Sequence, residues 1–183
     1  ADSVAYDTHD ADDALQLGLL SLDDLAETAL WREAIGRVRA RYAGLAGPEL
    51  RRAVLHELID WQVGDLLAQS WARIEQSGVS SVADVRRAPL VVRANAELGE
   101  KKAELERFLH QRVYRHPQVL VQRDLAQGEL RELFAGYLAL PQLMPERFRQ
   151  RVAEHGLERT VADYLAGMTD RFARSEYARL FAA

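Results

Sequence analysis

The sequence predicts an all-α protein: a multi-helix bundle with long central helices and no sheet. Apolar residues recur at helical spacing along most of the 183 residues, and no stretch alternates with the period of two that strands show. Glycine and proline interrupt these apolar patterns at a few places, where we expect helix ends. We therefore expect a single helical domain or fragment over 1–183.

The first two helices are expected before residue 44. Residues 2–19 carry apolar side chains along one side of a helix. Ser21 and Asp24 have the spacing of an N-cap residue and its partner three positions later, so they predict the start of a helix that covers much of 22–43.

A long helix is expected after Gly47-Pro48. Proline is favoured in the first turn of a helix, and the apolar pattern continues over 49–76. At ~1.5 Å per residue this helix is about 40 Å long. Residues 79–93 are the least regular stretch, and the helical pattern resumes over 94–115.

His116-Pro117 predicts a boundary, because a residue before proline disfavours the helical conformation. Three more helices are expected after it, over 118–139, 145–155 and 157–181.

Composition excludes several classes of protein. The chain is 48% hydrophobic and 28% charged, which excludes a disordered segment. No apolar run approaches the roughly 20 residues that cross a bilayer. Without cysteine, there are no disulfides, thiolate metal sites or cysteine nucleophiles, and we expect a cytoplasmic location. The sequence opens without Met or a signal peptide, as if cut into the first turn of a helix, so we expect a fragment of a longer protein.

Charge is distributed unevenly along the chain. Residues 1–31 contain eight acids and no Lys or Arg, so 32–183 hold the other 20 acids and all 24 bases. An acidic end beside a basic remainder suits a cation and a polyphosphate bound near each other. The net charge of −4 argues against a dedicated duplex-DNA binder.

The most informative residues are Asp2, Tyr6 and Asp10, which are spaced i, i+4, i+8. At ~100° per residue they fall within about 80° of one another on one helix face. A carboxylate for a hard metal ion, an aromatic ring for a sugar and a second carboxylate for a hydroxyl would together line a nucleotide pocket. The alternative is structural: acids in a first helical turn complement the helix dipole, and polar residues opposite an apolar face are usually solvated.

Three segments of the sequence resemble segments of one enzyme family. ADSVAYDTHDADDALQLGLL at 1–20 resembles the family segment that carries its last metal-binding aspartate. FLHQRVYRHPQVL at 108–120 is similar to the family pattern FL-x-x-x-VYRHP-x-V, and LERTVADYLAGMTDRFARSEYARLF at 157–181 is similar to its C-terminal pattern. The three segments follow the family order. The family is that of the bacterial dGTPase-like, HD-domain deoxynucleoside triphosphate triphosphohydrolases. The resemblance identifies the chain as the C-terminal portion of such an enzyme, with an HD-domain-like helical fold.

The resemblance implies a reaction and roles for three residues. Family members hydrolyse a dNTP, dGTP among them, to a deoxynucleoside and intact triphosphate, with one divalent metal ion (Mg or Mn, or another transition metal). By this resemblance Asp2 is the last metal ligand, Tyr6 packs under the deoxyribose and crowds a 2′-hydroxyl, and Asp10 binds the 3′-hydroxyl.

The sequence departs from the family in one respect. The upstream His and the His-Asp pair that complete the metal site are absent, and His9-Asp10 aligns with the helix after the last ligand rather than with that pair. Adjacent residues on a helix point about 100° apart, so His9 and Asp10 do not form a metal-binding pair. We expect no complete catalytic set in this chain, and hence no activity from it alone.

The resemblance also implies partners: a homo-oligomer, and dNTP effectors as well as substrates. Arg32, Arg37, Arg39 and Arg41 form a basic cluster that would suit an effector nucleotide or single-stranded DNA, although a solvated helix face is the favoured explanation. No membrane partner is expected. The alternative function, of a different class, is a non-catalytic helical assembly or a module that binds single-stranded nucleic acid.

Overall fold

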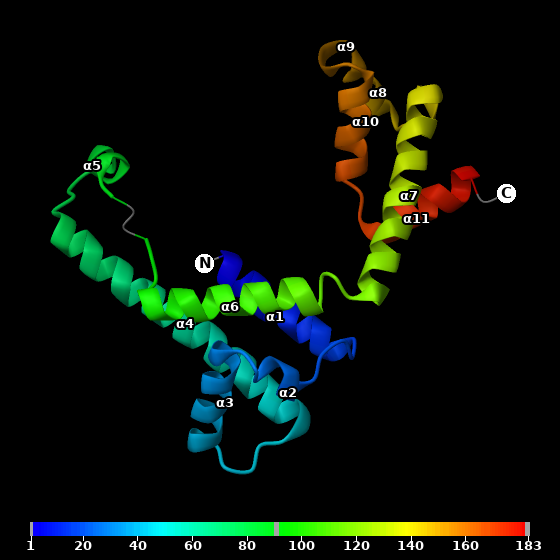
Figure 1. Ribbon diagram of the computed structural model, residues 1–183. Coiled ribbons are helices and arrows are strands. Elements are labelled where there is room, and N and C mark those ends of the chain that lie inside the picture. The colour runs from blue at the N-terminus through cyan, green and yellow to red at the C-terminus, as the bar shows by residue number, and fades with distance from the viewer. Residues whose placement is uncertain (1, 90–91, 182–183) are drawn as a thin grey trace. The chain divides into compact units, whose positions relative to one another are not determined.

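The computed structural model describes residues 2–89 and 92–181, which form helices and no strand (Figure 1). The predicted all-α class is confirmed. The chain divides into two compact units, and the boundary in the sequence falls at His116-Pro117. The sequence predicts one helical domain or fragment, with only a helix boundary at this pair.

The first unit contains the helices up to His116. They are α1 (Asp2–Gln16), α2 (Leu22–Leu25), α3 (Ala29–Arg41), α4 (Gly47–Ser77), α5 (Val82–Arg87) and α6 (Ala96–Arg112). The long helix expected after Gly47-Pro48 is α4, and it ends at Gly78, whose φ of 64° lies in the left-handed region that glycine adopts readily. α5 follows the far end of α4 (Figure 1).

The helix predicted over 22–43 is two helices. Ser21 forms the predicted capping box with Asp24, but α2 ends after one turn and α3 begins at Ala29. The break is stabilised locally, because the hydroxyl of Thr28 donates a hydrogen bond to the Leu25 carbonyl at 2.8 Å. The guanidinium of Arg32 also donates to two carbonyls of the connecting turn. Such side-chain bonds compete with a continuous helix.

The core of the first unit lies where α1, α3, α4 and α6 pack together. Burying one large aliphatic side chain contributes about 1.5–3 kcal/mol, so a cluster of this size stabilises the unit substantially before the loss of chain entropy is counted. Its largest fully buried members are Trp31, Leu25, Leu30, Leu58, Leu105, Leu109 and Val54.

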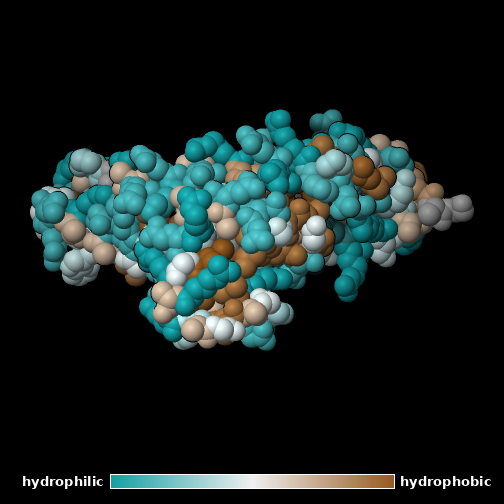
Figure 2. All heavy atoms as spheres, turned by 60° about the horizontal axis from the view of Figure 1, so that its bottom comes forward, coloured by the Kyte–Doolittle hydropathy of each residue, from teal (hydrophilic) through white to brown (hydrophobic). Residues whose placement is uncertain are grey.

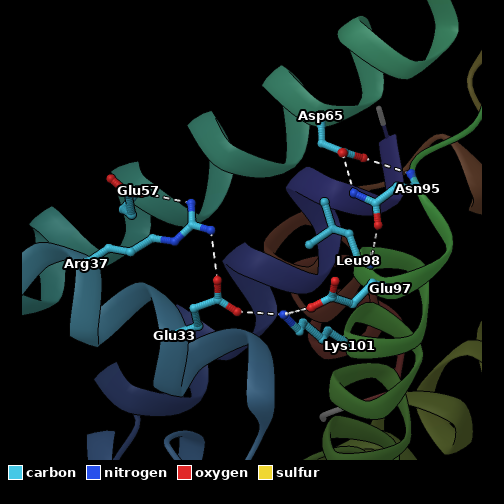
Figure 3. Close-up of polar contacts among 8 residues, drawn as sticks. All are labelled: Glu33, Arg37, Glu57, Asp65, Asn95, Glu97, Leu98 and Lys101. Atoms are coloured by element: carbon cyan, nitrogen blue, oxygen red, sulfur yellow. Dashed lines mark hydrogen bonds and ion pairs between the residues drawn. The ribbon is translucent and has the colours of Figure 1, made fainter.

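Ion pairs tie α3, α4 and α6 together around this core (Figure 3). The ammonium of Lys101 lies 2.6 Å from Glu33 of α3. Arg37 of α3 lies 3.6 Å from Glu57 of α4, and its guanidinium stacks 3.7 Å above the ring of Trp61. A cation over an indole ring adds about 0.5–1 kcal/mol at an exposed site.

The second unit contains the helices from Pro117 onward. They are α7 (Pro117–Ala139), a 3-10 turn η1 (Pro141–Leu143), α8 (Glu146–Arg149), α9 (Val152–His155), α10 (Leu157–Ala166) and α11 (Asp170–Phe181). The helix predicted over 145–155 is thus divided into α8 and α9, and the helix predicted over 157–181 into α10 and α11.

The break between α10 and α11 has a local cause. Gly167 is the C-cap of α10, and the hydroxyl of Thr169 accepts a hydrogen bond from the backbone N–H of Phe172 at 3.3 Å. Glycine weakens a helix interior by about 1 kcal/mol, and a threonine that satisfies the next helix's first N–H groups favours a new start.

The second unit has its own core, with a polar network at its edge. Tyr137 of α7 is fully buried and packs edge-on against Tyr164, with ring centroids 5.3 Å apart. Its hydroxyl donates a hydrogen bond to Glu176 of α11 at 2.6 Å, and Arg179 pairs with the same carboxylate at 2.7 Å. The Arg179 hydrogen bonds hold the pKa of Glu176 below its usual value, so the network keeps its charge at neutral pH.

Hydrophilic residues cover most of the surface seen in Figure 2, and hydrophobic residues gather in separate patches. Among the described residues, no helix combines the length and the apolar character that a membrane crossing requires.

Candidate functional site

The three residues predicted to line a pocket, Asp2, Tyr6 and Asp10, all lie on α1. Asp2 is in its first turn and is exposed, Tyr6 is 56% exposed, and Asp10 is half-buried. Because α1 is continuous, their spacing places them along one side of the helix, away from the buried Val4 and Ala11. We refer to these three residues as the α1 face.

A residue just after the end of α6 contacts the α1 face. The hydroxyl of Tyr114 donates a hydrogen bond to Oδ2 of Asp10. Tyr114 follows the last residues of α6, where the chain leaves the helix and its N–H bonds to the Leu109 carbonyl at 3.0 Å. The ring of His110, one turn earlier, meets the Tyr114 ring edge-on. The end of α6 therefore fixes the position of the Asp10 carboxylate.

The environment of Tyr114 keeps its phenol protonated. Burial raises the pKa of Tyr114 well above its usual value, and the neighbouring carboxylate of Asp10 and phenol of Tyr6 raise it further. A protonated phenol remains a hydrogen-bond donor, so Tyr114 holds Asp10 throughout the physiological pH range.

Two other acids of α1 have structural roles. Asp7 is buried and forms an ion pair with Lys102 of α6 at 2.5 Å, and burial raises the pKa of Asp7 despite this pair. Asp12 pairs with Arg51 of α4, and this hydrogen bond lowers the pKa of Asp12. These pairs join α1 to α6 and α4, so the acids of α1 do not act as one solvated stripe. The three residues of the α1 face take no part in these two pairs.

The described part of the chain contains no group of three or more His, Cys, Asp or Glu side chains placed to hold a metal ion. Asp2 is a single exposed carboxylate, and His9 is exposed while the neighbouring Asp10 is engaged by Tyr114. A hard divalent ion takes about six oxygen ligands, so a site at Asp2 needs ligands from outside these residues. The residues present do not by themselves fit a metal site.

The basic cluster predicted as an effector or nucleic-acid site is largely engaged within the first unit. Arg37 pairs with Glu33 at 2.8 Å as well as with Glu57, and Arg41 lies 3.7 Å from Glu57. Arg32 donates to backbone carbonyls. Charges neutralised in this way attract phosphates less strongly than free arginines would.

Sequence reasoning missed Tyr114 as a site residue. The sequence singled out its segment through the VYRHP pattern but gave no reason to place a tyrosine near residue 10, because the contact spans 104 positions. It also missed the contact of Lys102 with Asp7, although Lys101 and Lys102 are the only lysines of the chain.

Comparison with known families and proteins shows what the chain is similar to. Residues 92–179 match the family described as a Phosphohydrolase-associated domain. This range begins before α6 and therefore includes Tyr114 and nearly all of the second unit.

Several curated relatives match the chain over almost all of its residues. A deoxyguanosinetriphosphate triphosphohydrolase-like protein of Azoarcus sp. (strain BH72) is 38% identical over 100% of this chain and 48% of its own length. That of Geobacter sulfurreducens is 39% identical over 99% of this chain and 47% of its own length. The chain is a homologue of these proteins. A further relative, protein 1 of this kind in Deinococcus radiodurans, is 42% identical over 98% of this chain and 48% of its own length.

The similarity to triphosphohydrolase-like proteins confirms the resemblance that the three sequence segments predicted. The chain corresponds to the C-terminal part of these relatives and spans about half of their length.

Proposed function

We propose that this chain forms the C-terminal part of a metal-dependent dNTP triphosphohydrolase and contributes the α1 face to its active site. In the proposed reaction, water adds to the α-phosphorus of a dNTP and the bond from that phosphorus to the 5′-oxygen breaks. The 5′-oxygen takes up a proton, so the products are a deoxynucleoside and triphosphate. The observation that carries the proposal is the exposed α1 face with its second carboxylate held in place by Tyr114.

Tyr6 and Asp10 would bind the sugar of the substrate. The exposed ring of Tyr6 offers a flat apolar surface on which a deoxyribose packs, and a 2′-hydroxyl would be crowded there. Tyr114 engages Oδ2 of Asp10, and we assign the other oxygen, Oδ1, to the 3′-hydroxyl. A carboxylate that is already positioned loses less conformational freedom when the substrate binds.

Asp2 would be one ligand of a divalent ion, Mg or Mn or another transition metal, and the part of the relatives beyond this chain would supply the others. Such an ion polarises a phosphate and lowers the pKa of bound water. Asp2 lies two helical turns from Asp10, which is about 12 Å at ~1.5 Å per residue. This spacing suits a substrate whose phosphates lie at one end of the α1 face and whose 3′-hydroxyl lies at the other.

Homo-oligomerisation and regulation by dNTP effectors remain part of the proposal, with dGTP as one possible substrate. The contacts of Arg37 and Arg41 with acidic side chains weigh against the basic cluster as an effector site. They weigh equally against the alternative function, a non-catalytic module that binds single-stranded nucleic acid.

A joined polypeptide tests the proposed function. This chain is fused to the segment of a relative that it does not cover, and triphosphate release from dNTPs is measured with Mn²⁺. We expect release from the fusion and none from the chain alone, because the described residues lack a complete metal site. Salt-sensitive binding of single-stranded DNA by a fusion that hydrolyses no dNTP would favour the alternative.

The Asp10→Asn variant of the fusion is expected to raise KM by about tenfold with a smaller change in kcat, because it weakens one charge-assisted hydrogen bond to the sugar. Tyr114→Phe removes the donor to Asp10 but keeps the ring, so we expect a smaller rise in KM in the same direction. Steady-state kinetics measure both. An unchanged KM in Asp10→Asn would show that Asp10 is only a surface acid.

A further inference from the structure

Asp7 is the buried acid of α1, and it comes directly after Tyr6 of the α1 face. Its carboxylate lies 2.5 Å from the ammonium of Lys102 in α6, and the two side chains are only 8% and 18% exposed. Burial raises the pKa of Asp7, and the hydrogen bond from Lys102 opposes that rise. A buried carboxylate needs such a partner, because an unpaired charge away from water is strongly unfavourable.

The apolar contacts of α1 are made by small side chains. Its buried apolar residues are Val4, Ala11 and Ala14, and the buried Thr8 donates a hydrogen bond to the Val4 carbonyl of its own helix at 2.8 Å. Small side chains interlock with a neighbouring helix less deeply than large ones, so they resist rotation of a helix about its axis only weakly. The rotation of α1 therefore depends on its polar contacts with other helices.

We propose that Lys102 is a positioning residue, which fixes the rotation of α1 and thereby the place of the Tyr6 ring beneath the substrate sugar. This inference rests on the proposed function. The residues of a helix turn together, so a rotation that brings Asp7 toward water moves Tyr6 by the same angle. A rotation of ~20° at a radius of roughly 6 Å displaces the ring by about 2 Å.

A preference for deoxynucleotides that depends on Lys102 is the consequence. Without its ammonium, the carboxylate of Asp7 is buried and unpaired, and α1 turns to hydrate it. The Tyr6 ring then leaves the place in which it crowds a 2′-hydroxyl, and a ribonucleoside triphosphate is admitted. Glu106 cannot replace Lys102, because it carries the same charge as Asp7 and itself accepts a hydrogen bond from Lys102.

Lys101 provides a matched control, because it makes the same kind of contact with a different helix. Its side chain is 19% exposed, and its ammonium lies 2.6 Å from both Glu33 of α3 and Glu97 of α6 (Figure 3). Lys101 thus joins α6 to α3, whereas Lys102 joins α6 to α1. Lys101→Met and Lys102→Met each remove one ammonium from a pair of carboxylates, but only Lys102→Met releases the helix that carries Tyr6.

Substrate discrimination by the fused polypeptide tests the proposal. The measurement is the kcat/KM for a dNTP divided by that for the matching ribonucleoside triphosphate. We expect Lys102→Met to lower this ratio at least tenfold, because a small displacement of a sugar-contacting group has a large effect on discrimination. Lys102→Arg keeps a cation beside Asp7 and should restore most of the ratio. Lys101→Met should leave it unchanged.

A merely structural role for Lys102 gives a different result. Loss of folded protein lowers both values of kcat/KM by the same factor and leaves their ratio unchanged. An unchanged ratio in Lys102→Met therefore overturns the proposal, as does an equal fall in Lys101→Met. A fusion with the natural lysines that hydrolyses both nucleotides equally well also overturns it.

Nuclear magnetic resonance of this chain with ¹³C-labelled tyrosine provides a readout without turnover. The ring signal of Tyr6 should shift in Lys102→Met, return in Lys102→Arg and stay in place in Lys101→Met. A Tyr6 signal that does not shift in Lys102→Met overturns the positioning role, even if the fusion is an active hydrolase. If the signal shifts as expected but the fusion hydrolyses no dNTP, the proposed function fails, and the discrimination that depends on it fails with it.

Discussion

Asp2→Ala in the fused polypeptide is expected to reduce kcat/KM by about a thousandfold or more, equivalent to roughly 4 kcal/mol of transition-state stabilisation. Removal of a ligand carboxylate leaves the ion bound weakly and out of place. The fold should be unaffected, because Asp2 is exposed and its contribution to the helix dipole is about 0.3–1 kcal/mol. Triphosphate release measures the first effect and thermal unfolding the second.

Ser3→Ala is the matched control for Asp2→Ala, because Ser3 is the exposed neighbour in the same turn of α1. Its turnover should equal that of the unaltered fusion. If Asp2→Ala retained full kcat, Asp2 would be an ordinary first-turn acid of α1, and the metal-ligand assignment would be wrong.

Trp31→Ala is expected to lower the free energy of unfolding of the first unit by about 3–5 kcal/mol. Trp31 is fully buried in α3 and belongs to the cluster that joins α1, α3, α4 and α6. Truncation removes a large apolar side chain and leaves a cavity that the surrounding helices fill only in part. Urea unfolding followed by far-ultraviolet circular dichroism measures the change.

Trp31→Phe separates the packing of Trp31 from its polar atom. The indole N–H of Trp31 is buried and has no hydrogen-bond partner among the described residues. An unpaired buried donor costs about 1–3 kcal/mol, and phenylalanine removes that donor while retaining a ring. We therefore expect Trp31→Phe to destabilise the unit much less than Trp31→Ala. Both variants remove the N–H, so equal losses would indicate that the retained ring contributes no packing at this position.

Helix positions were predictable where proline or glycine marks an end. Pro48, Gly78 and Pro117 lie at helix boundaries, as their backbone preferences require. The breaks after Leu25 and Ala166 were not predicted, because apolar periodicity continues through them. These breaks depend on hydroxyl side chains, at Thr28 and Thr169, whose bonds to the backbone are not apparent from periodicity.

The α1 face was predictable because its three residues share one helix, where spacing alone decides which side they occupy. The residues that support it come from distant positions: Tyr114 contacts Asp10, and Lys102 contacts Asp7 across 95 positions. Such contacts depend on how helices cross, which a single sequence does not state. The division into two units was also missed, since the pattern around Pro117 is the same for a bend within a domain and a boundary between units.

The position of Tyr114 near the end of the first unit has a consequence for shortened forms of the chain. It stands three residues before Pro117, where the second unit begins, and its hydroxyl binds the carboxylate of Asp10. Asp10 is therefore held by one of the last residues of the first unit. A polypeptide that ended before Tyr114 would retain α1 but lose the hydroxyl that donates to this carboxylate.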